Sequence, residues 1–68
     1  MREYEIIQEF LEIDKDINIE DEVASIVCIV NSSKPLECKI DGIQLVIMKK
    51  LGKFMLYSEC ENLYNKLI

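Results

Sequence analysis

The 68-residue chain has no histidine, only one proline and two glycines, and no long hydrophobic run. Without histidine, the chain cannot form the Ser-His and Cys-His pairs of many hydrolases, and most zinc sites are excluded. No apolar run approaches the about 20 residues that a membrane-spanning helix needs. The start, Met1–Glu5, is acidic and lacks the basic and apolar regions of a secretion signal. We therefore expect a cytoplasmic protein, of a host cell or an infected cell, that does not associate with membranes.

The charge of the chain is strongly uneven. Half of the residues are hydrophobic, which is enough for one small domain over residues 1–68. The net charge of −5 argues against direct nucleic-acid binding, which needs a basic surface. Residues 1–22 hold nine acids and two bases, a net charge of −7, whereas residues 23–68 hold four acids and six bases, a net charge of +2. A binding function is expected to depend on this asymmetry.

The three cysteines, Cys28, Cys38 and Cys60, are odd in number and form no C-x-x-C pair. This usage is typical of a reducing compartment. We expect all three to be small buried hydrophobes, since free cysteine is among the most buried residue types. If one is reactive, Cys60 is the best candidate, because the first turn of a helix lowers the pKa of a thiol.

Two helices are expected in the first half of the chain. Residues 3–13 have an amphipathic helical pattern, with apolar side chains on one side and acids on the other. Residues 19–31 favour a helix that Asn18 can cap and whose first turn is acidic. The β-branched run 25–30 leaves a buried strand as the alternative.

The second half predicts strands. Ile40-Asp41-Gly42-Ile43 has the Asp-Gly pair of a two-residue hairpin turn. Pairing about this turn within residues 36–48 places six apolar side chains on one face: Leu36, Cys38, Ile40, Ile43, Leu45 and Ile47. Residues 54–57 predict a third strand. The expected fold is therefore α+β, with two N-terminal helices, a three-stranded antiparallel meander and a C-terminal helix.

The C-terminal helix is predicted from its start signal. Ser58-Glu59-Cys60-Glu61 matches a capping box, in which Ser58 and Glu61 bond each other's backbone amides. The helix then directs Cys60, Leu63 and Leu67 inward. A core this small gives only about 3–5 kcal/mol of net stability, so a homodimer or a bound partner would help to stabilise it.

No motif of the sequence indicates catalysis. Phosphate-binding glycine loops and nucleophile elbows are absent, and the carboxylates lie on solvated helix faces and first turns. Asp14, Asp16 and Asn18 alternate like a calcium loop, but Ile19 and Ser25 stand where such a loop needs glycine and glutamate. We therefore expect neither an enzyme nor a metal or cofactor site.

Two charged groups are candidate contact sites. Helical spacing places Glu5, Glu9, Glu12 and Asp16 on one face, and Glu20, Asp21 and Glu22 extend it. Such a face is either merely solvated or kept for a protein partner with a basic surface. The one basic cluster consists of Lys49, Lys50 and Lys53. These lysines could contact phosphate, or they could keep strand edges from pairing with other chains.

The stretch Val23–Met48 resembles the centre of Phd/YefM-type antitoxins. The resemblance lies in a helix, a polar turn with Pro35, a strand, the Asp41-Gly42 hairpin and a second apolar strand. In that family the N-terminal region dimerises and binds operator DNA, and a C-terminal tail wraps the toxin. The resemblance implies a DNA-binding repressor whose phosphate contacts would be Lys34, Lys39, Lys49, Lys50 and Lys53.

Three functions are thus open from the sequence. The favoured one is an inhibitory binding protein that uses its acidic N-terminal face to occupy the basic nucleic-acid site of a nuclease or defence complex. Phage anti-defence proteins, including many anti-CRISPR proteins, are similar in size and charge. The alternatives are the Phd/YefM-like antitoxin and a structural subunit of a larger complex, with exposed Val46 and Met48 as its contact.

Overall fold

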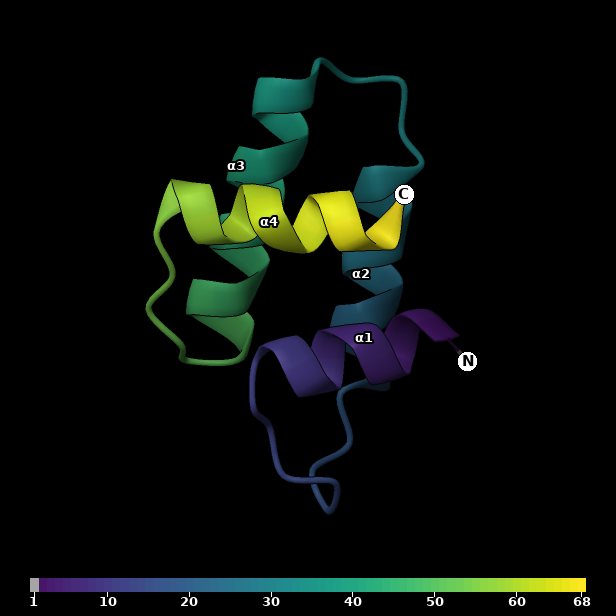
Figure 1. Cartoon of the computed structure of the whole chain (residues 1–68), viewed down its shortest axis with the longest axis vertical. Coiled ribbons are helices and arrows are strands. Elements are labelled where there is room, and N and C mark those ends of the chain that lie inside the picture. Colours follow the sequence, from purple (N-terminus) through teal and green to yellow (C-terminus); the bar gives the residue numbers. More distant parts are fainter. Residues whose placement is uncertain (1) are drawn as a thin grey trace.

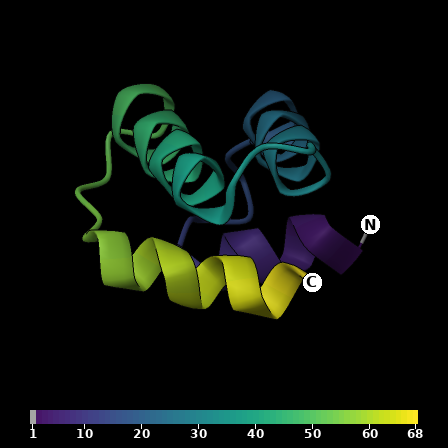
Figure 2. The same ribbon diagram turned by 90° about the horizontal axis from the view of Figure 1, so that it is seen from above.

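The computed structural model describes residues 2–68 and contains four helices: α1 (Arg2–Phe10), α2 (Glu20–Val30), α3 (Leu36–Lys50) and α4 (Tyr57–Leu67). Helices α2 and α3 run antiparallel in one layer, and α1 and α4 run antiparallel in a second layer that crosses the first (Figures 1 and 2). None of the described residues forms a strand. The predicted α+β fold with a three-stranded meander is therefore wrong, and the protein is all-helical.

Helix α3 occupies the residues that were expected to form the hairpin. Ile40, Ile43 and Ile47 recur at the i, i+3, i+7 spacing of a helix and are fully buried. The hairpin would also have buried Leu36, Cys38 and Leu45, but these three side chains are exposed. Residues 36–48 thus fit both the two-residue period of a strand and the 3.6-residue period of a helix. Burial of the isoleucine stripe against α2 and α4 outweighs the local turn preference of Asp-Gly. The strands that the antitoxin resemblance implies for residues 36–48 are likewise not formed.

Gly42 has a packing role in the middle of α3. A methyl group at this position would lie 3.3 Å from Cδ1 of Ile29 on α2. The missing side chain therefore permits a close approach between the two helices of the first layer. This contact offsets the about 1 kcal/mol of helix stability that a central glycine costs relative to alanine.

Helix α2 confirms the helical interpretation of residues 19–31. Val23 and Ile26 face the core, and Ile19, just before the helix, is also fully buried. The N-cap position is Ile19, which makes no side-chain cap hydrogen bond, so Asn18 does not take the N-cap position expected of it. From one residue earlier, the Oδ1 atom of Asn18 accepts a hydrogen bond of 2.8 Å from the backbone N–H of Glu20 and so still satisfies an amide at the helix start.

Helix α1 ends three residues earlier than its amphipathic pattern suggested. Glu12 adopts a left-handed conformation with φ 55°. The N–H groups of Glu12 and Ile13 then donate to the carbonyls of Glu9 and Gln8, at 3.2 and 3.1 Å. These two bonds are those of a Schellman motif, which closes the helix C-terminus. The chain beyond Phe10 leaves the helix, so only Glu5 and Glu9 of the expected stripe lie on it.

An extended segment, residues 52–56, connects α3 to α4 in place of the third strand expected at 54–57. Gly52, with φ 66°, ends α3 and lets the N–H of Lys53 reach the carbonyl of Ile47. Gln44 donates a 2.8 Å hydrogen bond to the carbonyl of Met55 and so holds the segment against α3. Without a neighbouring strand, this segment has no sheet to join.

The start of α4 differs from the predicted capping box. The carboxylate of Glu59 accepts a 3.0 Å hydrogen bond from the N–H of Leu56, so Glu59 takes the role expected of Glu61, two residues earlier. The inward face is as expected: Cys60 and Leu63 are fully buried, and Leu67 is half-buried against the core.

The two glycines make a matched test of this fold. We expect Gly42→Ala to leave the free energy of unfolding unchanged or raise it by up to about 1 kcal/mol, because alanine favours the helix and Ile29 can shift slightly. Gly52→Ala should lower it by about 1–2 kcal/mol, because alanine is strained at positive φ although the site has space. Urea titrations would measure both. A hairpin turn at Gly42 would instead make Gly42→Ala clearly destabilising.

Candidate functional site

The predicted acidic residues lie along α1, the loop after it and the first turn of α2. Glu5 and Glu9 are one turn apart on α1, Glu12 and Asp16 belong to the loop, and Glu20, Asp21 and Glu22 begin α2. All are exposed except Glu22, which is half-buried. These elements are neighbours in the fold, with the loop at the end of the molecule where α2 begins (Figure 1). The acids therefore lie on three consecutive elements of the chain and not on a single helical face.

Tyr4 fixes the position of α1 relative to the start of α2. Its hydroxyl accepts a 3.2 Å hydrogen bond from the N–H of Ile19 and lies 3.5 Å from the carbonyl of Ile17, to which it can donate. The hydroxyl thus joins α1 to the loop that leads into α2 and holds the two groups of acids in a defined relation. The sequence alone does not indicate this role of Tyr4, because the residue fits the amphipathic pattern of residues 3–13.

Glu12 is a residue that the fold does not favour at its position. The left-handed conformation at a helix end is normally taken by glycine or asparagine, because other side chains are strained there. A carboxylate is also unfavourable beside the negative end of the dipole of α1. Strained residues of this kind are concentrated at functional sites.

The acids that begin α2 have a structural role as well. The positive end of the helix dipole favours the negative charges of Glu20, Asp21 and Glu22. Lys50, at the end of the antiparallel α3, shares a surface hollow of about 130 Å³ with Asp21 and Glu22. Because this lysine reduces the local negative field, Asp21 and Glu22 contribute less to an acidic surface than the acids of α1 and the loop.

The lysines do not form the single surface that a repressor would need. Lys49 and Lys50 lie in the last turn of α3, where the dipole favours cations, and Lys53 follows closely. Lys39 lies at the other end of α3, where its Nζ donates a 2.9 Å hydrogen bond to the carbonyl of Val30 and lies 5.9 Å from the centre of the Tyr64 ring. It thus links the C-terminus of α2 to α4. The proposed role of the lysines in protecting strand edges is wrong, since the described chain has no strand.

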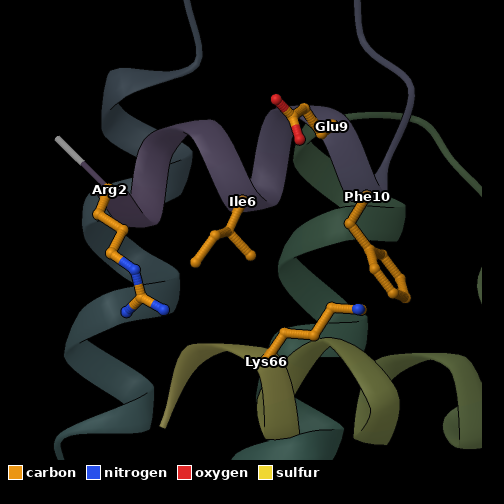
Figure 3. Close-up of a pocket in the computed structure, with 5 residues that line it drawn as sticks. All are labelled: Arg2, Ile6, Glu9, Phe10 and Lys66. Atoms are coloured by element: carbon orange, nitrogen blue, oxygen red, sulfur yellow. The ribbon is translucent and has the colours of Figure 1, made fainter.

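A hollow of about 440 Å³ lies between α1 and α4. Arg2, Ile6 and Phe10 point from α1 toward α4, and Lys66 extends from α4 toward them (Figure 3). Glu9 lines the rim, and its carboxylate points away from α4 (Figure 3). The two cations therefore limit the acidic surface on this side of α1, and Glu9 stays on the outer side.

The cysteines differ from expectation. Cys28 and Cys38 are exposed and line one hollow of about 250 Å³ between α2 and α3. Cys60 alone is buried, and its burial, with a smaller contribution from Glu59, raises its pKa to about 11. The thiol at the start of α4 is thus the least reactive of the three, because burial outweighs the helix dipole.

Two further classes of site can be assessed from the coordinates. Within residues 2–68, no three cysteine, aspartate or glutamate side chains are placed so that they could hold a metal ion together. None of the four helices combines the length and the apolar character needed to cross a bilayer.

No family model, curated protein or solved structure matches the chain.

Proposed function

We propose that the protein is a non-catalytic inhibitor that binds a partner protein through the acidic surface formed by α1, the following loop and the start of α2. Its central residues are Glu5, Glu9, Glu12, Asp16 and Glu20, all of them exposed. The partner carries a basic surface, and the basic nucleic-acid site of a nuclease or defence complex fits this chemistry best. In this role the carboxylates pair with the partner's lysines and arginines, which would otherwise contact the phosphates of a nucleic acid.

The charge distribution supports this proposal. The first 22 residues carry −7, and their only two bases are Arg2, beside α4, and Lys15, in the loop. A concentrated negative field steers a basic partner toward one side of the molecule and fixes its orientation. Because such attraction acts between exposed charges, binding should weaken as salt rises.

Glu12 is the observation that carries the proposal. Its backbone is strained, its charge is unfavourable beside the negative end of the dipole of α1, and its side chain is exposed. Packing therefore gives no reason for a carboxylate at this position, whereas a binding contact does.

Two matched variants test the location of the binding surface. The first neutralises Glu5, Glu9 and Glu12 to Gln and Asp16 to Asn. The second neutralises the four acids of residues 23–68, with Glu37, Glu59 and Glu61 changed to Gln and Asp41 to Asn, and so removes the same charge elsewhere. We expect the first to weaken binding of an oligolysine peptide at least about tenfold in titration calorimetry, a loss of about 1.4 kcal/mol, and the second to change it less than threefold.

The inhibitory step is tested with nucleic-acid cleavage by purified guide-RNA-directed nucleases. Inhibition should compete with the nucleic acid, fall as salt rises and be lost in the first variant only. Equal inhibition by the two variants would overturn the proposal, as would an absence of inhibition by the native protein across the nucleases tested.

Glu12→Gly separates stability from binding. We expect this variant to raise the free energy of unfolding by about 1 kcal/mol, because glycine removes the strain, while oligolysine binding weakens. A variant that gained stability and bound oligolysine as well as the native protein would remove the main support for the proposal.

A further inference from the structure

An exposed apolar and basic surface lies on the side of the molecule formed by α3 and the extended segment that follows it. We call this surface the 45–56 face. It contains four of the eight large apolar side chains that are exposed within residues 2–68, and the most exposed of these four is Phe54, at 76%. It also contains three lysines. Its residues are Leu45, Met48, Lys49, Lys50, Lys53, Phe54 and Leu56.

The 45–56 face is continuous because the extended segment is bound to α3. Gln44 holds the carbonyl of Met55 at 2.8 Å, and Met48 lies one turn further along the same flank of α3. Side chains alternate along an extended chain, so Phe54 and Leu56 point outward while Met55 is buried between them. Leu45 is adjacent to Met48 at the i, i+3 spacing and is 54% exposed.

The charge of this face indicates what covers it. Residues 42–58 contain three lysines and no acid, although the whole chain carries −5. Direct pairing of this face with itself would bring the lysines of two copies together, which is unfavourable. The complementary surface must therefore be acidic and must offer an apolar side chain.

The same chain carries such a surface in the loop between α1 and α2. Ile17 is 52% exposed there, and the exposed charges near it in the sequence are the acids Asp14, Asp16 and Glu20 and one base, Lys15. The two surfaces adjoin at the end of the molecule where α2 begins and α3 ends, because Lys50 and Asp21 line one hollow.

We propose that two copies of the protein form a two-fold dimer in which the 45–56 face of each copy docks on the Ile17 loop of the other. A two-fold axis between adjoining surfaces makes both contacts at once and closes the assembly, whereas non-reciprocal docking would produce open chains. The apolar residues are buried in the two contacts, and each lysine cluster meets the acids of the other copy. The dimer does not depend on the inhibitory role, but it covers Asp16 and Glu20, so dimerisation and binding of a basic partner to the acidic surface compete.

Sedimentation equilibrium of the full chain tests this assembly. We expect a monomer–dimer equilibrium that weakens as salt rises, because opposite charges meet at the contact. Phe54→Ser and Ile17→Ser should each weaken dimerisation at least about tenfold, since each removes a central apolar contact without changing the charge. The control is Leu36→Ser combined with Ile68→Ser, which removes exposed apolar side chains elsewhere and should leave the dimer unchanged.

Mixing the two single variants gives the decisive result. A heterodimer of the Phe54→Ser and Ile17→Ser chains retains one fully intact contact, so the mixture should dimerise more tightly than either variant alone. If two 45–56 faces paired with each other instead, Ile17→Ser would not affect the dimer. Salt would then strengthen the dimer, and mixing the two variants would not tighten it. That outcome, or a native protein that stays monomeric at millimolar concentration, would overturn the proposal. Oligolysine binding by these charge-neutral variants is measured at protein concentrations too low for dimerisation, so the failure of one proposal is distinguishable from the failure of the other.

Discussion

Ile47→Ala is expected to lower the free energy of unfolding by about 2–5 kcal/mol, an amount comparable to the whole stability of a domain of this size. The side chain is fully buried in the isoleucine stripe of α3, so its truncation leaves a cavity in the core. We expect the variant to be largely unfolded at 25 °C, with circular dichroism showing loss of helix.

Leu45→Ala is the matched control for this prediction. In a hairpin about Asp41-Gly42, Leu45 and Ile47 would share the buried face, and both truncations would be costly. In α3, Leu45 is 54% exposed, and its truncation should cost less than about 0.5 kcal/mol. The measurement is made at low protein concentration, where self-association contributes nothing. Similar losses for the two variants would contradict the helical assignment.

The stability of the protein is expected to fall by roughly 2–3 kcal/mol between pH 9 and pH 11 on account of Cys60 alone. The folded protein holds the pKa of this thiol at about 11, above its ordinary value of 9.0. In that interval the unfolded chain loses the proton while the folded chain keeps it, so rising pH favours unfolding. The contribution of the protonated Cys60 thiol to stability is fully present below pH 9 and is lost as the pH rises through 11.

Cys60→Ser isolates this effect, because the hydroxyl does not titrate in the interval. Urea titrations at pH 8 and pH 11 give, for each protein, the free energy of unfolding that is lost between the two pH values. Tyrosines and lysines contribute equally to this loss in both proteins. The native protein should lose about 2–3 kcal/mol more than the variant. Equal losses in the two proteins would show that the thiol of Cys60 is not buried in the folded state.

Helices α2 and α4 could be predicted from the sequence, whereas α3 could not. Helix α2 has an acidic first turn and a hydrogen bond from the N–H of Glu20 to Asn18, and local signals and burial agree there. In α3 they disagree: Asp41-Gly42 favours a turn locally, while Ile40, Ile43 and Ile47 fit a helix. The helix prevails because the three isoleucines are buried against α2 and α4, and these contacts exist only in the folded molecule.

The candidate site was predictable in composition but not in shape. The excess of acids in residues 1–22 can be counted in the sequence, but their division among α1, the loop and the start of α2 follows from where the helices begin and end. The strain at Glu12 could not be foreseen, because it follows from where α1 ends. The use of Lys39 to join α2 to α4 also depends on packing between helices that are distant in the sequence.

The crossed arrangement of the two layers has a consequence for the order of folding. Helices α2 and α3 are consecutive, and their contact closes only a short connection, so this pair can form early and fast. The second layer joins the first and last helices of the chain (Figure 2). During synthesis on a ribosome, α1 can pack against α2 first, but its contact with α4 forms only after α4 has emerged, so the second layer is completed after the first.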